Sequence, residues 1–200
     1  MNRKEHWESI YASKDDADLS WTQPEQRLSL SLIKEVCAHG RIVDIGGGTS
    51  SLAAGLLDAG YTVAVLDVSE AALSRARARL GSRAGEVRWI VADVITSPDL
   101  GAFEVWHDRA VFHFLTSPAD RTAYIALMAR TIPSGGHVVM ATFAPDGPEK
   151  CSGLEVCRYD GPSLAATLGK EFSLLKSERE LHLTPRGKPQ SFQYSLFLRA

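Results

Sequence analysis

Four aspartates follow short apolar segments along the chain: Asp44, Asp67, Asp93 and Asp108. Carboxylates accept hydrogen bonds from hydroxyl and amino groups and attract positive charge. The carboxyl ends of parallel strands meet at one edge of a sheet, where ligands of open α/β sheets bind, so we expect the four side chains to line one site. Each acid alone equally fits a surface or capping role. Their repetition predicts a nucleoside ligand with an amino or other cationic group.

Two of these acids have specific partners in this hypothesis. Asp67 lies roughly twenty residues after a glycine turn, the position at which a carboxylate accepts from ribose hydroxyls. Asp93 is placed to accept from the exocyclic amine of adenine. Val68 and Val94 would offer apolar faces to the ring. The ribose contact alone also fits a nicotinamide dinucleotide.

The glycine turn separates a short β-branched segment from an apolar helical pattern, which predicts a strand, a turn and a helix. Gly46 and Gly48 let the backbone come close to a ligand, although an ordinary strand-to-helix turn explains them equally well. The dinucleotide fingerprint G-x-G-x-x-G is incomplete, because its third position is Ser51. Negative potential from Asp44 and Asp108 also disfavours a pyrophosphate.

Candidate proton acceptors follow the fourth predicted strand. Asp108 and His113 are the main candidates for a general base, with His107 behind them, because histidine titrates near neutrality. His107 lies within a strand pattern and also fits the core. Phe112 and Phe114 flank His113, and they fit either a substrate pocket or the core.

The elements that would position these residues alternate regularly. Apolar segments separated by helical patterns predict βαβ units and a parallel sheet, and two further segments without a helix between them predict a closing hairpin. The predicted fold is α/β, a Rossmann-like, doubly wound, mostly parallel seven-stranded sheet with an antiparallel C-terminal hairpin strand. Strands are expected near residues 41–45, 62–67, 87–92, 103–108, 137–143, 171–183 and 191–198, with an irregular loop at 144–153.

The chain is expected to form a single domain, residues 1–200, with a helical lid segment (1–40) and a Rossmann-like core (41–200). Trp7, Tyr11 and Trp21 stand out in the polar lid segment. Packing on the core explains them most simply, and covering the ligand pocket is the functional alternative.

The composition of the chain limits the classes of partner that we expect. The net charge is −2 with no long basic run, so we expect neither nucleic acid nor a membrane as partner. No signal peptide or spanning segment is evident, and the three cysteines suit a reducing compartment, which predicts a cytoplasmic protein. Cys151 and Cys157 lack the paired spacing of zinc ligands, so no metal is expected.

Taken in order, four segments resemble the class I S-adenosylmethionine-dependent methyltransferases, and small bacterial members in particular. These are Val43 to Ser50, Leu66 to Ser69, Val91 to Val94 and the closing hairpin. The resemblance implies S-adenosylmethionine as cofactor and S-adenosylhomocysteine as product. It implies that the Asp44 to Gly48 loop lies along the methionine part, Asp67 binds the ribose, Asp93 and Val94 meet adenine, Asp108 stands beside the methyl group, and Trp7, Tyr11 and Trp21 close over the cofactor.

The acceptor is less defined. Members that methylate bases or glutamine often carry Asn/Asp-Pro-Pro-Tyr/Phe after the fourth strand, whereas this chain has His-Asp-Arg-Ala-Val at 107–111, so those acceptors are not expected. The prediction is in-line methyl transfer to a small molecule or protein side chain. Phe143, Asp146, Glu149 and Cys151 are candidates for acceptor choice. An NAD-linked oxidoreductase and a non-catalytic S-adenosylmethionine-binding module are the alternatives, and the oligomeric state is not readable.

Overall fold

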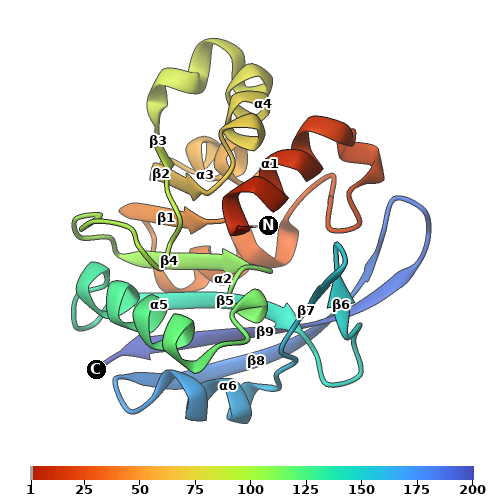
Figure 1. Cartoon of the computed structure of the whole chain (residues 1–200). Helices are drawn as coiled ribbons and strands as arrows, with labels where there is room; N and C mark the ends of the chain where they lie inside the picture. The colour runs from red at the N-terminus through yellow and green to blue at the C-terminus, as the bar shows by residue number, and fades with distance from the viewer. Residues whose placement is uncertain (1) are drawn as a thin grey trace.

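The computed structural model describes residues 2–200, which form a seven-stranded sheet in the order β3-β2-β1-β4-β5-β9-β8, with helices on both faces (Figure 1). The strands of this sheet are β1 (Arg41–Ile45), β2 (Thr62–Asp67), β3 (Val87–Val91), β4 (Val105–Arg109), β5 (His137–Phe143), β8 (Phe172–Leu183) and β9 (Pro189–Arg199). The helices are α1 (Arg3–Ser13), α2 (Arg27–Val36), α3 (Leu52–Asp58), α4 (Glu70–Leu80), α5 (Pro118–Thr131) and α6 (Gly161–Leu168).

Strands β1 to β5 are parallel, and β9 runs antiparallel to both β5 and β8. The predicted fold, including the antiparallel strand of the closing hairpin, is therefore confirmed. This edge also departs from the parallel 3-2-1-4-5-6 order typical of dinucleotide binders. The loop predicted at 144–153 is partly ordered, because β6 (Lys150–Cys151) and β7 (Leu154–Glu155) pair as a small hairpin.

Both faces of the central strands are buried, because successive side chains point to opposite faces. In β1, Val43 and Ile45 pack in the cluster that contains residues of α5 and α6, whereas Ile42 packs in the cluster with α2, α3 and α4. Figure 1 shows α5 and α6 in front of the sheet and α2 behind it. Burying one such side chain contributes about 1.5–3 kcal/mol, so both layers hold the sheet rigid beneath the site.

Two helices near the site begin at capping side chains. Asn2 and Glu5 form a capping box at the start of α1. Ser69 accepts from the backbone N–H of Ala72 at 3.1 Å and so caps α4. These caps satisfy N–H groups that a helix leaves unpaired, and they fix where α1 and α4 begin beside the carboxyl edge of the sheet.

Among residues 2–200, no helix is both long enough and apolar enough to cross a bilayer. The same residues contain no group of three or more His, Cys, Asp or Glu side chains arranged to hold a metal ion.

Candidate functional site

A cleft opens at the edge of the sheet where β1, β2 and β4 end, beneath α1. It holds about 720 Å³ of space, part of it open to solvent. Predicted site residues on its wall are Trp7, Tyr11, Trp21, Gly46, Asp67, Val68, Asp93 and Val94. Asp44 and Gly46 border an adjoining hollow, and Gly48 borders a third.

The glycine turn forms the floor. Gly46 and Gly48 have φ angles of +65° and +51°, in the left-handed region that glycine adopts without strain. A Cβ on Gly46 would lie 2.0 Å from Cγ2 of Val111, and one on Gly48 would lie 2.5 Å from the hydroxyl of Tyr11. The turn therefore admits no side chain at either position.

Asp67, at the end of β2, is 5% exposed and faces the cleft. Its Oδ2 accepts from the backbone N–H of Gly48 at 2.9 Å, and its Oδ1 accepts from that of Ser69 at 2.8 Å. Burial raises the pKa of Asp67 to about 6, although both hydrogen bonds act to lower it. Each oxygen keeps a lone pair with which to accept from a ligand hydroxyl.

Asp93 lies at the other side of this wall. Its Oδ1 accepts from the backbone N–H of Ile95 at 3.2 Å, and its Oδ2 pairs with Arg3 of α1 at 2.8 Å. The same guanidinium reaches Asp120 at 2.8 Å. Val94 is buried beside Asp93 and lines the cleft. Arg3 is not among the predicted site residues, because nothing in the polar N-terminal pattern distinguishes this arginine from a solvated one.

Helix α1 is fastened over the cleft by a second contact. Glu8 accepts from Ser69 Oγ at 3.0 Å and from the backbone N–H groups of Glu70 and Ala71 at 2.8 and 3.2 Å. Its carboxylate thus lies at the N-terminus of α4, where the helix dipole favours negative charge. Figure 1 shows α1, in red, next to α4.

Aromatic rings form the roof. The ring of Trp7 lies 5.1 Å from that of Phe114 and 5.8 Å from that of Trp21, and Tyr11 lies 6.2 Å from Trp21. All four side chains line the cleft. Tyr11 and the leucine at position 19 are also buried in a small cluster of their own, so the rings both pack on the domain and cover the cleft.

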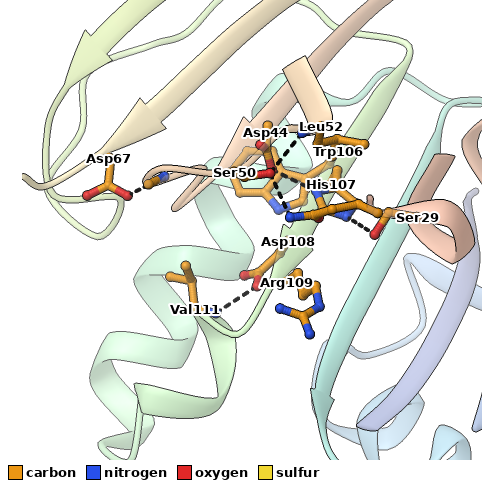
Figure 2. Close-up of polar contacts among 12 residues, drawn as sticks. Ser29, Asp44, Ser50, Leu52, Asp67, Trp106, His107, Asp108, Arg109 and Val111 are labelled. Atoms are coloured by element: carbon orange, nitrogen blue, oxygen red, sulfur yellow. Dashed lines mark hydrogen bonds and ion pairs between the residues drawn. The ribbon is translucent and has the colours of Figure 1, made fainter. Parts of the chain in front are cut away.

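Asp44 and His107 are level with each other on β1 and β4. Figure 2 shows His107 between two partners: its Nδ1 is 2.7 Å from Asp44 Oδ1, and its Nε2 is 2.9 Å from Ser29 Oγ. All three are buried. These two hydrogen bonds connect α2 to the sheet beneath the glycine turn. It gives His107 a structural place, as the alternative interpretation of this residue predicted.

Asp108 does not reach the cleft, so the predicted position beside the methyl group needs correction. Its side chain is fully buried and accepts from the backbone N–H groups of Val111 and Phe112 at 2.9 and 3.0 Å and from the Tyr124 hydroxyl. Ala110 turns the chain at φ +72° and so aims these N–H groups back at Asp108. Burial raises the pKa of Asp108 to about 6. Its carboxylate holds the segment after β4 in place (Figure 2).

His113 is likewise withdrawn. It is fully buried and does not line the cleft, and its Nδ1 accepts from the backbone N–H of Phe143 at 3.2 Å. Burial lowers its pKa to about 3, with a smaller contribution from the positive charge of Arg109. A neutral imidazole sealed in the core is not placed to act as the predicted general base. Pattern alone could not tell this core histidine from a pocket residue, because Phe112 and Phe114 flank it in both cases.

Of the residues predicted for acceptor choice, one lines the cleft. Cys151 is buried on its wall, and burial raises the pKa of its thiol to about 11. Phe143 is buried in the core, while Asp146 pairs with Arg179 and Glu149 pairs with Arg158 on the exposed side of the loop. The predicted loop therefore contributes one side chain to the cleft. Arg109 at the end of β4 and Ala110 and Phe114 after it also line the cleft, in agreement with the expectation that the segment from Asp108 to Leu115 helps to build the acceptor site.

Comparison with known proteins gives one family match. Residues 42–136 match the model of a family described as "Methyltransferase domain". One curated relative, an eEF1A lysine and N-terminal methyltransferase of Danio rerio, is 24% identical over 147 residues. The match covers 71% of this chain but 21% of the relative.

Solved structures share the fold. The N-methyltransferase NodS of Bradyrhizobium japonicum, in complex with S-adenosylhomocysteine, superposes with a TM-score of 0.74 at 15% identity, covering 99% of both chains. The 1,6-didemethyltoxoflavin-N1-methyltransferase of Burkholderia thailandensis gives 0.73 at 18% identity, covering 98% of this chain and 84% of the other.

Proposed function

We propose that this chain is a class I S-adenosylmethionine-dependent methyltransferase, as the match of residues 42–136 to a methyltransferase-domain family supports, and that it transfers a methyl group to a small-molecule or protein side-chain acceptor in the cleft. The observation that carries the proposal is the arrangement of that cleft. The side-chain-free glycine turn, the Asp67 carboxylate and the aromatic roof meet at the carboxyl edge of the sheet. Ligands of open α/β sheets bind at this edge.

The residues present fit the cofactor. Asp67 is already oriented by two backbone N–H groups, so its free lone pairs can accept from ribose hydroxyls. Val68 and Val94 supply apolar surface for adenine, and Asp93 supplies an acceptor for the amine, shared with Arg3. Gly46 lets the methionine part lie against the backbone of the turn.

When bound, S-adenosylmethionine would supply a methyl group on a positively charged sulfur, and this sulfur would leave with the bonding electrons when the acceptor atom attacks the methyl carbon in line. The protein mainly aligns the two reactants and excludes water. Trp7, Tyr11 and Trp21 exclude water from the cleft, and the glycine turn aligns the reactants. Because Asp108 and His113 are sealed off, the proton of a protonated acceptor leaves to solvent or to another group.

The proposal is tested in two steps. Purified protein is titrated calorimetrically with S-adenosylmethionine, S-adenosylhomocysteine and NADH, and then incubated with methyl-labelled S-adenosylmethionine and a fractionated cell extract. We expect both sulfur ligands to bind, NADH not to bind, and label to appear in protein or small-molecule fractions.

Asp67→Asn should weaken binding of both sulfur ligands by roughly ten- to a hundredfold and lower the labelling accordingly. Asp99→Asn is the matched control, because Asp99 is exposed, outside the cleft, and bonded only locally to Gly101. Binding of NADH alone would overturn the proposal, and cofactor binding without label in any fraction would favour the non-catalytic module.

A further inference from the structure

Arg109 is a cation in the cleft with no anionic partner. It is the last residue of β4, and its Nη1 donates to the backbone carbonyl of Trp21 at 2.9 Å while its Nε donates to the Tyr194 hydroxyl at 3.1 Å. Its guanidinium carbon lies 4.4 Å from the centre of the Phe192 ring. All three groups are uncharged, and within residues 2–200 no carboxylate lies within ion-pair distance. The side chain is therefore held in place without being neutralised.

One end of this guanidinium is unsatisfied. Its Nη2 is buried and has no hydrogen-bond partner among the described residues, although buried donors nearly always have one. The other arginine of the cleft differs, because Arg3 pairs with Asp93 and Asp120. An unpaired, buried and charged donor at the wall of a ligand cleft indicates that the partner is a ligand.

The position of Arg109 indicates which ligand. Its neighbours are Ala141 on β5 and the aromatic side chains of β9, and Figure 2 shows it well apart from Asp67, on the β5 side of the glycine turn. The ribose is expected at Asp67, so Arg109 lies away from the ribose end, on the boundary between the cleft and the adjoining hollow that Asp44 and Gly46 border, and we infer that the acceptor binds on its β5 side. Trp21, Phe114 and Cys151 form the neighbouring wall.

We propose that Arg109 selects the acceptor by binding a carboxylate or similar planar oxyanion on it, and that the acceptor is a small, flat or apolar anionic molecule. This inference rests on the proposed methyltransferase function. A planar guanidinium matches a carboxylate through two parallel hydrogen bonds, and the surrounding rings offer apolar faces to the rest of the molecule. The same uncompensated cation repels a lysine ammonium, so the inference favours a small anionic acceptor over a lysine side chain.

The probes are benzoate and benzamide, which share shape but differ in charge, titrated into protein saturated with S-adenosylhomocysteine. We expect wild type to bind benzoate about tenfold more tightly than benzamide, because a charge-assisted hydrogen bond replaces a neutral one. Arg109→Gln should abolish that preference. Arg88→Gln is the control, because Arg88 lies outside the cleft, also lacks an ion pair among residues 2–200, and donates only to the carbonyl of Leu100.

A second arm separates the acceptor from the carboxylate of the cofactor itself. S-adenosylhomocysteine and 5′-methylthioadenosine, which lacks the amino-acid end, are titrated into both arginine variants. We expect Arg109→Gln to leave both affinities within about threefold of wild type, since the carboxylate that Arg109 binds belongs to the acceptor and not to the cofactor. Loss of S-adenosylhomocysteine affinity alone would overturn the inference and leave the methyltransferase proposal standing, as would equal binding of benzoate and benzamide. Failure of wild type to bind S-adenosylhomocysteine would instead overturn the proposed function.

Discussion

Replacing Asp67 with asparagine tests the cofactor site, because it removes a carboxyl group whose ionisation should control cofactor binding. In the folded protein the carboxyl group is buried, and burial raises its pKa from the usual 3.8 to about 6. Ribose hydroxyls donate hydrogen bonds, so cofactor binding favours the ionised carboxylate. Below about pH 6, each unit by which the pH falls should therefore weaken cofactor binding roughly tenfold. Above about pH 6 the affinity should be constant.

The size of the substitution effect follows from the same contacts. A hydrogen bond to a charged group contributes about 1.5–3 kcal/mol, so Asp67→Asn should weaken S-adenosylhomocysteine binding by roughly ten- to a hundredfold at pH 7.5. The pH dependence should vanish with the carboxyl group. The amide also places an N–H₂ group near the backbone donors of Gly48 and Ser69, which adds strain without removing the cleft.

The same pKa has a consequence for folding. The folded state binds the proton of Asp67 more tightly than the unfolded state, so stability from this group falls as pH rises from about 4 to 6 and is constant above. The shift from 3.8 to about 6 corresponds to a loss of about 3 kcal/mol over that range, to order of magnitude. The contribution of Asp108 to stability also falls as the pH rises, because burial raises its pKa to about 6 as well.

Calorimetric titration of S-adenosylhomocysteine between pH 5 and 8, in buffers of different ionisation enthalpy, measures both the affinity and the protons released. Asp108→Asn is the matched control, because Asp108 is equally buried and titrates near the same pH but lies outside the cleft. It should lower stability and keep the pH dependence of binding. Affinity that stays constant below pH 6 in wild type, or a pH dependence that survives in Asp67→Asn, would refute the reasoning.

Two further substitutions test the packing around the site. Tyr124→Phe removes the hydroxyl that donates to Asp108 and accepts from the indole of Trp106 at 2.8 Å, so urea unfolding should show a loss of about 1–3 kcal/mol; an unchanged midpoint would contradict the assigned role. Gly46→Ala places a methyl group against a side chain 2.0 Å away at a positive φ, and should unfold the turn or abolish S-adenosylhomocysteine binding. Gly60→Ala, also at positive φ but in open space, should cost only the backbone strain of about 1–2 kcal/mol and retain binding, and equal effects of the two alanines would refute the close-approach explanation.

Local patterns were enough to predict the sheet. The β-branched segments and the glycine turn depend on backbone preferences within a few residues, and the structure has the strands of its main sheet close to the expected ranges. The closing hairpin was predictable for the same reason, since no helix fits between its strands. Asp67 and Asp93 reach the cleft because Asp67 ends β2 and Asp93 follows the adjacent parallel strand β3, an arrangement that the alternation of elements already implied.

The amino-acid sequence by itself determined the fold class, the position of the ligand edge and the acids gathered along it, because these follow from short-range periodicity and from the geometry of parallel strands. Only the tertiary structure decided which way each side chain at this edge of the sheet points. Asp108 points into the core and accepts from two backbone N–H groups, and His113 is buried there as well, whereas Arg109, the next residue along the strand, lines the cleft with no ion-pair partner among residues 2–200. Neighbours on a strand point to opposite sides, and whether the side facing a given residue is core or ligand depends on packing from distant segments such as Trp21 and β9.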